Sequence, residues 1–387
     1  LEGSLDARLL QPPPPVATRA PTGYPRPMTH KTLTPARPRP PRTLALLAAL
    51  AGALLLPARA QVDIQPAVET EAVAGDADDP AVWVNRADPA RSRILGTDKG
   101  GALYVFGLDG RIRQKISGLQ RPNNVDVEYG FPRNGQAIDI AVLTEARAHR
   151  LRIYEISPAG QLTDISSPHT TVFDGQAQPM GIALYRRPAD GVIYALVSKK
   201  TDPDHRILGQ YQLLGDPDGK VRLKEIRRFG RFSGTGTVEA VAVDDELGWV
   251  YYADESTGIR KYPADPDHPA ASRELALFGT DEYSADREGI ALYPQPRGRG
   301  CLICTDQLKN SRYLIYPRAG PPENPHQHGR AIKIIRGGAD HTDGIEAVSE
   351  PLGPRFPQGI LVAMNSKGRN FKIYDWRDIA QTGKPKL

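Results

Sequence analysis

A repeat of about fifty residues is the feature of this sequence that most constrains its fold. Each unit has a strand of small apolar residues, a longer apolar strand, and a strand that ends on an aromatic residue. Gly, Pro, Asp and Asn separate these runs, which is typical of an all-β fold. The aromatic residues lie 48, 57, 51, 54 and 58 residues apart and are Phe106, Tyr154, Tyr211, Tyr262, Tyr316 and Tyr374.

The order of the strands favours a six-bladed β-propeller over a long β-sandwich, which would not explain one order recurring six times. The first strands are predicted at 78–84, 123–129, 179–185, 238–244, 287–293 and 343–349. The second strands are predicted at 93–99, 138–146, 192–200, 248–256, 300–307 and 359–366. A fourth strand comes from the variable stretches. The segment Gln61–Gly75 could add a strand to the last blade and close the ring.

The first sixty residues differ in character and are predicted to be a leader. Basic residues precede an apolar run at Leu44–Leu56, and Ala58-Arg59-Ala60 offers small residues at a cleavage point before Gln61. Met28 is a candidate start, with residues 1–27 upstream of it. Thirteen apolar residues are too few to span a bilayer. We therefore expect a leader at 1–60, a propeller at 61–387, and a mature protein that is periplasmic or secreted, outside any membrane and monomeric.

The formal charge of +5 belongs to the leader rather than to the predicted domain. Residues 1–60 hold eight of the 50 Lys and Arg residues but only two of the 45 Asp and Glu residues. The remainder carries a formal charge of −1, so the sequence gives no electrostatic reason to expect a nucleic-acid partner.

The cysteines and three clustered histidines are assigned no chemistry. Cys301 and Cys304 would lie about 10 Å apart on one strand, beyond disulfide distance, so we interpret them as small buried residues. Two cysteines alone make no zinc site. His326, His328 and His341 fall in a region rich in Pro and Gly and are interpreted as solvated loop residues.

Charged residues are predicted to gather at one mouth of the central channel. In a propeller blade, the start of the first strand and the end of the second lie at the same end of the ring. Strand-one starts contribute Asp78, Asp79, Asn123, Asn124, Glu239, Asp286, Glu288 and Asp343. Strand-two ends contribute Asp98, Lys99, Glu145, Arg147, Lys199, Lys200, Asp254, Glu255, Asp306 and Lys367.

Converging carboxylates repel one another unless some are protonated or cations neutralise them. Oxygen ligands without His or Cys favour hard cations, Ca²⁺ before Mg²⁺. The interleaved Lys and Arg side chains then need an anion, and phosphate satisfies both sets. A structural salt-bridge network, or calcium that only braces the ring, remains the alternative for any single acid.

At these residues the chain resembles the β-propeller phytases, secreted Ca²⁺-dependent phosphatases that act on myo-inositol hexakisphosphate. The resemblance extends from Glu69 to Trp376. Its most specific blocks are "DADDPAVWVN" (76–85), "GTDKGGALYVF" (96–106), "RPNNVDVEYGFP" (121–132) and "TDGIEAV" (342–348).

The resemblance implies a role for each matching residue. The ligands of a catalytic calcium cluster would be Asp78, Glu239, Glu255, Asp286, Glu288 and Asp343. Structural calcium sites would use Glu69, Asp79, Pro80, Asn123 and Val125, and further ligands would be Gly344 and Asn365. Substrate phosphates would be held by Lys99, Arg147 and Lys200. Other members often have Tyr at Met180 and Lys at Gly100, which puts a secondary phosphate site in doubt.

The expected reaction is direct hydrolysis by a metal-activated water, without a covalent phospho-enzyme, because no suitable nucleophile is found. Lys99, Arg147, Lys200, Glu239 and Glu255 are the expected catalytic residues, phytate the substrate and Ca²⁺ the cofactor. Two other classes remain open: a Ca²⁺-dependent propeller lactonase, which normally has few surrounding lysines, and a non-catalytic binding propeller.

Overall fold

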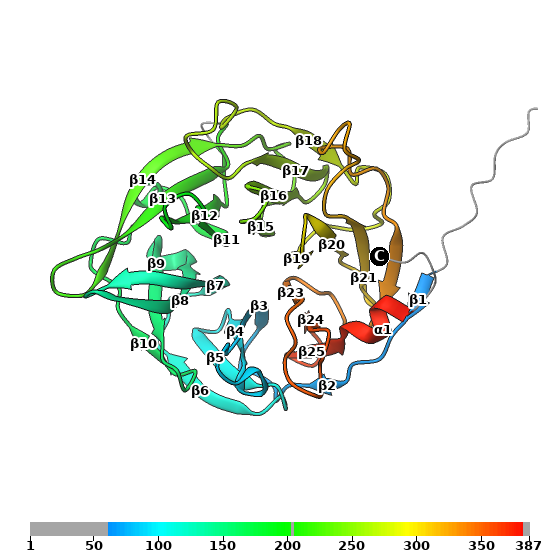
Figure 1. Ribbon diagram of the computed structural model, residues 1–387, viewed down its shortest axis with the longest axis horizontal. Coiled ribbons are helices and arrows are strands. Elements are labelled where there is room, and N and C mark those ends of the chain that lie inside the picture. The colour runs from blue at the N-terminus through cyan, green and yellow to red at the C-terminus, as the bar shows by residue number, and fades with distance from the viewer. Residues whose placement is uncertain (1–60, 203–204, 382–387) are drawn as a thin grey trace, which may run out of the picture. The chain divides into compact units, whose positions relative to one another are not determined.

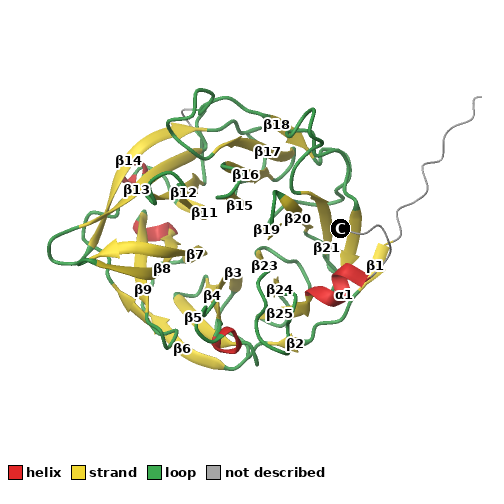
Figure 2. Cartoon of the chain, in the orientation of Figure 1, coloured by secondary structure: helices red, strands yellow, loops and turns green. Residues whose placement is uncertain are grey.

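The computed structural model describes residues 61–202 and 205–381, and these residues form six small sheets around a central axis (Figure 1). Within the described residues, strands dominate (Figure 2). Among residues 61–202 and 205–381, helix is confined to α1 (Trp376–Gln381) and the 3₁₀ turns η1 (Pro89–Arg91), η2 (Ala146–Ala148) and η3 (Phe173–Gly175).

The first three blades are antiparallel sheets of consecutive strands. Blade 1 consists of β3 (Ala77–Trp83), β4 (Arg93–Asp98), β5 (Ala102–Gly107) and β6 (Ile112–Ser117). Blade 2 consists of β7 (Pro122–Arg133), β8 (Gln136–Glu145), β9 (Arg150–Ile156) and β10 (Leu162–Asp164). Blade 3 consists of β11 (Pro179–Arg186), β12 (Ile193–Lys199), β13 (Leu208–Gly215) and β14 (Val221–Phe229).

The last three blades continue the order, with two strands added from the N-terminal side. Blade 4 consists of β15 (Val241–Asp244), β16 (Trp249–Asp254), β17 (Gly258–Pro263) and β18 (Ala276–Phe278). Blade 5 consists of β19 (Ile290–Gln295), β20 (Arg299–Asp306), β21 (Arg312–Pro317), β22 (Lys333–Arg336) and β1 (Gln61–Asp63). Blade 6 consists of β23 (Ile345–Val348), β24 (Ile360–Asn365), β25 (Asn370–Asp375) and β2 (Val68–Glu69).

The ring is closed by the segment that precedes the first unit. Val68 and Glu69 in β2 pair antiparallel with Ile373 and Lys372 in β25, so the outermost strand of blade 6 comes from the other end of the chain. β1 pairs parallel with β22 and adds a fifth strand to blade 5. The predicted six-bladed β-propeller and its closure by 61–75 are both confirmed.

The hydrophobic core consists of separate clusters between neighbouring blades. One such cluster joins Ile94 and Phe106 of blade 1 to Val362 and Phe371 of blade 6. A side chain at Gly96 would lie 2.2 Å from the Phe371 ring, so this glycine lets the two blades pack closely. All six repeat aromatics are at most 2% exposed, which explains why each third strand ends on one.

Three innermost strands begin later than predicted. Regular pairing starts at Val241, Ile290 and Ile345, whereas the predicted strands began at residues 238, 287 and 343. The early residues of these predicted strands, including Glu239 and Glu288, instead lie in irregular backbone ahead of the sheet. The apolar pattern continues through both parts, so alternation alone could not locate the boundary.

The cysteines are free and buried, as predicted, but the interpretation of His328 as a solvated residue was wrong. His328 is 3% exposed and stacks on Phe278 with 4.4 Å between ring centroids. Its Nε2 lies 3.1 Å from the buried Lys261 Nζ, and its Nδ1 lies 2.9 Å from Pro317 O. His341 is exposed and His326 is half-buried.

The predicted leader at 1–60 lies outside the described residues. In the part of the chain that is described, no helix has the length and hydropathy needed to cross a membrane.

Candidate active site

Irregular backbone places the candidate residues at one mouth of the channel. In blades 1 to 3 the pairing of the innermost strand shifts register between Ala77 and Pro80, Pro122 and Val125, and Pro179 and Ile182. In blades 4 to 6 the equivalent residues precede the strand altogether. Bulges commonly redirect side chains near active sites, and here they free polar residues from the ladder.

Buried hydroxyl groups on the second strands fix this irregular backbone. Thr97, Thr144, Ser198 and Thr305 are fully buried and accept the backbone N–H groups of Asp79, Asn124, Gly181 and Gly289, at 2.9, 3.1, 2.8 and 2.7 Å. The first three also donate to the next blade, to the carbonyl oxygens of Asn123, Met180 and Val238. The mouth is therefore stabilised from blade to blade.

Lys99 lies among carboxylates from three different blades. Its Nζ is 2.7 Å from Asp78 Oδ1, 3.2 Å from Asp343 Oδ2 and 4.0 Å from Glu239 Oε2. Burial lowers the pKa of Lys99, but the three carboxylates outweigh burial and raise it above its ordinary value. Lys99 is thus a permanent cation at the centre of the predicted site.

The remaining acids of the predicted catalytic group adjoin this centre. Asn123 Nδ2 donates to Glu239 Oε2 at 3.0 Å. Thr237 donates its backbone N–H to Glu255 Oε2 at 2.6 Å and its hydroxyl to Glu255 Oε1. Burial, reinforced by Glu255, Glu239 and Asp343, raises the pKa of Glu288 to about 9. Six predicted carboxylates therefore interact with one another: Asp78, Glu239, Glu255, Asp286, Glu288 and Asp343.

This cluster holds more negative charge than Lys99 can balance. Burial, followed by Asp343 and Glu239, raises the pKa of Asp78 although Lys99 lowers it. Asp78 Oδ2 and Asn123 Oδ1 are buried and lack a hydrogen-bond partner among the described residues. Unpartnered buried oxygens are costly, and a hard cation would satisfy them.

Among residues 61–202 and 205–381, no three His, Cys, Asp or Glu side chains are already arranged to hold a metal ion. Lys99 occupies the position between three of the acids that a cation would take. The donor set of carboxylate, amide and carbonyl oxygens fits Ca²⁺. Because Lys99 already lies among these acids, a bound ion would have to share the space with the Lys99 side chain.

A second predicted group surrounds Asp79. Asp79 Oδ2 accepts the N–H of Val125 at 3.1 Å, and Thr97 connects Asp79 to the carbonyl of Asn123. A methyl group at Gly344 would lie 2.3 Å from Asp79 Oδ1, so only glycine permits this approach. Burial raises the pKa of Asp79 well above its ordinary value. Asp79, Pro80, Asn123, Val125 and Gly344 are therefore close together.

Within the described residues, the side chains of Glu69 and Asn365 bond to residues outside the central cluster. Glu69, on the outermost strand of blade 6, forms an ion pair with Lys372 at 3.2 Å and is contacted by Asn370 Nδ2 at 3.3 Å. Asn365 Nδ2 donates to Asn370 Oδ1 at 2.7 Å, and its Oδ1 accepts the N–H of Asp340. These two predicted ligands are linked to each other through Asn370.

Arg147 and Lys200 lie where the second strands of blades 2 and 3 end, and both are exposed. Within the described residues neither side chain forms an ion pair or a hydrogen bond, which leaves both open to solutes. Met180 is 1% exposed and its carbonyl accepts from Thr144. A side chain at Gly100 would lie 2.8 Å from Asp98 Oδ1, so the local packing disfavours a lysine there.

Four acids predicted at the mouth act as loop anchors instead. Asp98 accepts the N–H groups of Gly75, Asp76 and Gly100. The counterparts in other blades likewise accept backbone N–H groups and pair with arginines, and they are Glu145, Asp254 and Asp306. The residue after the anchor interacts with the acidic cluster in two blades: Lys99 in blade 1 and Glu255 in blade 4.

By this rule blade 5 contributes Gln307, which the sequence reasoning missed. Gln307 Nε2 donates to Asp343 Oδ1 at 2.6 Å. Thr237 and Arg287 were also missed, although Thr237 lies two residues before Glu239 and Arg287 lies between Asp286 and Glu288. Aligning the six strand-two ends residue by residue would have found Gln307, because it follows Asp306 as Lys99 follows Asp98.

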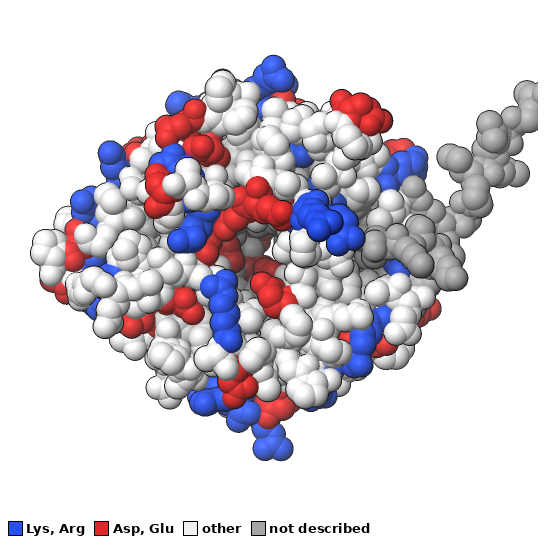
Figure 3. Space-filling view, viewed as in Figure 1, with Lys and Arg blue, Asp and Glu red and all other residues white. Residues whose placement is uncertain are grey.

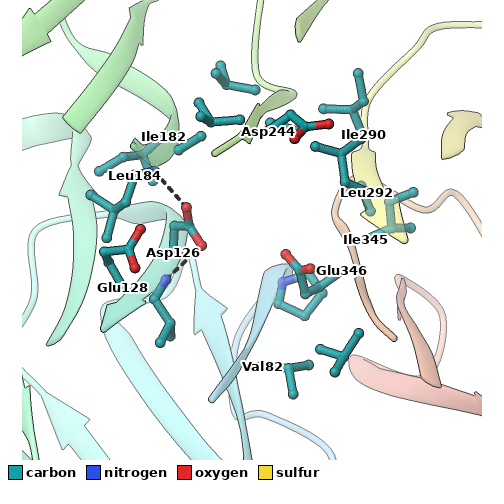
Figure 4. A pocket seen from close by; sticks show the side chains of 18 of the residues that line it. Val82, Asp126, Glu128, Ile182, Leu184, Asp244, Ile290, Leu292, Ile345 and Glu346 are labelled. Atoms are coloured by element: carbon teal, nitrogen blue, oxygen red, sulfur yellow. Dashed lines mark hydrogen bonds between the residues drawn. The ribbon is translucent and has the colours of Figure 1, made fainter. Parts of the chain in front are cut away.

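The channel itself contains further acids that were not predicted. A cavity of about 390 Å³ is lined by apolar inner-strand residues and by carboxylates that include Asp126, Glu128 and Glu346 (Figure 4). Burial raises the pKa of Asp126 to about 7, and burial with the neighbouring Glu128 raises that of Asp245 to about 9. Figure 3 shows acidic side chains around the central hollow, with Lys and Arg side chains nearby.

The comparisons with known proteins agree with this geometry. A sequence model of the phytase family matches residues 43–386. The chain is 34% identical over 331 residues to the 3-phytase of Bacillus subtilis (strain 168), an alignment that covers 81% of this chain and 83% of that enzyme. The chain belongs to the β-propeller phytase family. Membership of the phytase family makes it an enzyme and does not favour a lactonase or a non-catalytic binding propeller.

Two solved structures show a weak likeness to this chain. BBS1N in complex with ARL6DN aligns over 79% of both chains with 11% identity and a TM-score of 0.46. The β-propeller domain of Cps50 (Swd1) from Myceliophteria thermophila aligns over 77% of this chain and 83% of that one, with 13% identity and a TM-score of 0.42.

Proposed function

We propose that this phytase hydrolyses phosphate monoesters of phytate, myo-inositol hexakisphosphate, in a calcium-dependent reaction with no covalent phospho-enzyme. The observation that carries the proposal is the cluster around Lys99, in which Asp78 Oδ2 and Asn123 Oδ1 are buried without partners. When bound, calcium lowers the pKa of a coordinated water and offsets charge on phosphoryl oxygens.

The proposed ligands form two sets. Those nearest the reacting phosphate would be Asp78, Glu239, Glu255, Asp286, Glu288 and Asp343. Those of the other calcium sites would be Glu69, Asp79, Pro80, Asn123, Val125, Gly344 and Asn365. Burial, reinforced by repulsion from the other acids of the first set, raises the pKa of Asp78 and Glu288, which supports a need for added positive charge.

Lys99, Arg147 and Lys200 would bind and orient the substrate. Each lies at the end of a second strand, and Arg147 and Lys200 are exposed. A phosphate held by such cations accepts charge-assisted hydrogen bonds, which position it against the acidic cluster. The same cations offset the charge that grows on the phosphoryl oxygens during hydrolysis.

Phosphate release from myo-inositol hexakisphosphate tests the proposal directly. The purified protein is assayed after removal of divalent ions, then with added Ca²⁺, then with excess chelator. We expect release only with Ca²⁺. Release that continues undiminished in excess chelator would contradict the calcium requirement, and no release in any condition would contradict the substrate.

Replacing Glu239 with Gln tests the role of the acidic cluster. The change removes one charge but keeps the size and the contact with Asn123, so the fold should persist while kcat falls by at least about 10²-fold. The measurement is phosphate release, with circular dichroism to verify folding. Full activity in the folded variant would exclude Glu239 from the site.

We further propose that residues 1–60 are a cleaved leader and that the mature domain, 61–387, is monomeric and leaves the cytoplasm. The apolar run at Leu44–Leu56 and the small residues before Gln61 support cleavage. Mass spectrometry of the mature N-terminus in the exported fraction tests this proposal.

A further inference from the structure

Arg287 is a buried arginine between two of the proposed calcium ligands, Asp286 and Glu288. It is 4% exposed, and its side chain turns away from the acidic cluster toward the seam between blades 4 and 5. Its guanidinium carbon lies 4.1 Å from the centroid of the Tyr283 ring. A buried guanidinium is unfavourable unless its N–H groups donate hydrogen bonds, so the acceptors of Arg287 show what its burial stabilises.

The hydrogen bonds of Arg287 join three separate segments. Nη1 donates to the carbonyl of Glu255 at 2.6 Å. Nε and Nη2 donate to the carbonyl of Gly279 at 3.0 and 2.8 Å, and Nη2 also reaches Thr280 O at 3.4 Å. In the described residues, all its hydrogen-bond partners are backbone carbonyls.

These segments carry three of the six carboxylates of the cluster. Glu255 follows β16, and Asp286 and Glu288 precede β19, where no regular ladder holds the backbone. The other side of the Arg287 segment is held by the Thr305 hydroxyl, which accepts the N–H of Glu288 at 3.1 Å. One guanidinium therefore connects the backbone of ligands from two blades.

We propose that Arg287 is a positioning residue that holds Glu255, Asp286 and Glu288 in the arrangement that receives calcium. This inference rests on the proposed calcium dependence. The planar fork of Arg287 can bond two carbonyls at fixed angles, which a lysine cannot do.

Arg287→Lys tests the assignment, and Arg227→Lys is its matched control. Arg227 also donates to backbone carbonyls, those of Ala271, Pro263 and Ala264, and its guanidinium carbon lies 4.0 Å from the Phe229 ring centroid. It belongs to β14, the outermost strand of blade 3, away from the cluster. Both variants lose comparable packing, but only Arg287 borders the proposed calcium ligands.

Calcium binding is measured by titration calorimetry on the chelator-treated full chain, with melting curves alongside. We expect both variants to melt earlier than the wild type. Only Arg287→Lys should bind calcium roughly 10–100-fold more weakly. It should also need correspondingly more calcium for half-maximal activity, while its KM for phytate at saturating calcium stays unchanged. If the Arg287→Lys variant does not fold, the Arg287→Met variant, which removes the charge, is measured in its place.

The outcomes separate the two proposals. If the wild type takes up no calcium, the proposed calcium dependence is wrong and the role of Arg287 falls with it. If the wild type binds calcium and the folded Arg287 variant binds it as tightly as the Arg227 variant does, only the positioning role is overturned, and Arg287 is a structural residue.

Discussion

Lys99 shows at the scale of a single residue how this site tolerates its own charge. Its ammonium contacts Asp78 and Asp343 and lies 4.0 Å from Glu239, so one lysine offsets acids from blades 1, 6 and 4. Without it, these acids would have to bind protons or a metal ion. Lys99 therefore has a structural role as well as the proposed role toward substrate.

Replacing Lys99 with Met should destabilise the protein more without calcium than with it. Leaving buried acids unpaired costs about 3 kcal/mol at neutral pH, and a bound ion would replace the lost charge. Urea unfolding in chelator and in excess Ca²⁺ measures the difference. An equal loss of unfolding free energy in both conditions would show that calcium does not bind beside Lys99.

His328 should make the fold sensitive to acid. Burial, followed by the charge of Lys261, lowers its pKa from 6.5 to about 4. Because the pKa is lowered, His328 takes up its proton at a lower pH in the folded protein than in the unfolded chain. The contribution of neutral His328 to the free energy of unfolding is complete above about pH 6.5. It is lost as the pH falls toward about 4, and the loss amounts to at most about 3 kcal/mol.

His328→Gln should therefore flatten the fall in melting temperature between pH 6.5 and 4. The control is His169→Gln, because His169 is exposed. Parallel pH profiles for wild type and the His328 variant would contradict this reading of the buried pair with Lys261.

At the scale of the element, the innermost segments combine a regular strand with an irregular entry. The regular part packs between blades, and the entry presents polar groups to the channel mouth. The hydroxyls of Thr97, Thr144, Ser198 and Thr305 replace the missing ladder bonds. This arrangement lets a sheet that is otherwise fully paired expose carboxylates where several blades meet.

Thr97→Val should cost about 1–3 kcal/mol of unfolding free energy, because it leaves the buried N–H of Asp79 without an acceptor. Denaturant unfolding measures the loss, with Thr163→Val, at an exposed position of β10, as the control. A loss no larger than that of the control would mean that the hydroxyl bridge is dispensable.

At the scale of the whole molecule, the ring depends on strands from both ends of the described chain. β2 completes blade 6 and β1 extends blade 5, so the N-terminal segment covers the edges of β25 and β22. Exposed edges are templates for association, which this closure prevents. It also ties Glu69 to Lys372, some 300 positions away in the sequence.

A chain that begins at Glu71, without β1 and β2, should melt at a lower temperature and self-associate. The comparison is a chain that begins at Gln61 and keeps both strands. Scanning calorimetry and size-exclusion chromatography measure the two effects. Equal melting temperatures and equal elution would show that the ring does not need the closing strands.

The sequence by itself determined the number of blades, the all-β fold, the closing segment and the end of the ring where charge gathers. It could do so because side-chain alternation and turn residues are local properties of the sequence. Local patterns could not separate Glu255, which faces the cluster, from Asp254, which anchors a loop one residue earlier. They also could not reveal the burial of His328, the link from Glu69 to Asn370 or the bonds of Arg287. The contacts of His328 and Arg287 join residues of neighbouring blades, and the contact of Glu69 joins the two ends of the described chain within blade 6. All of them exist only once the ring has closed.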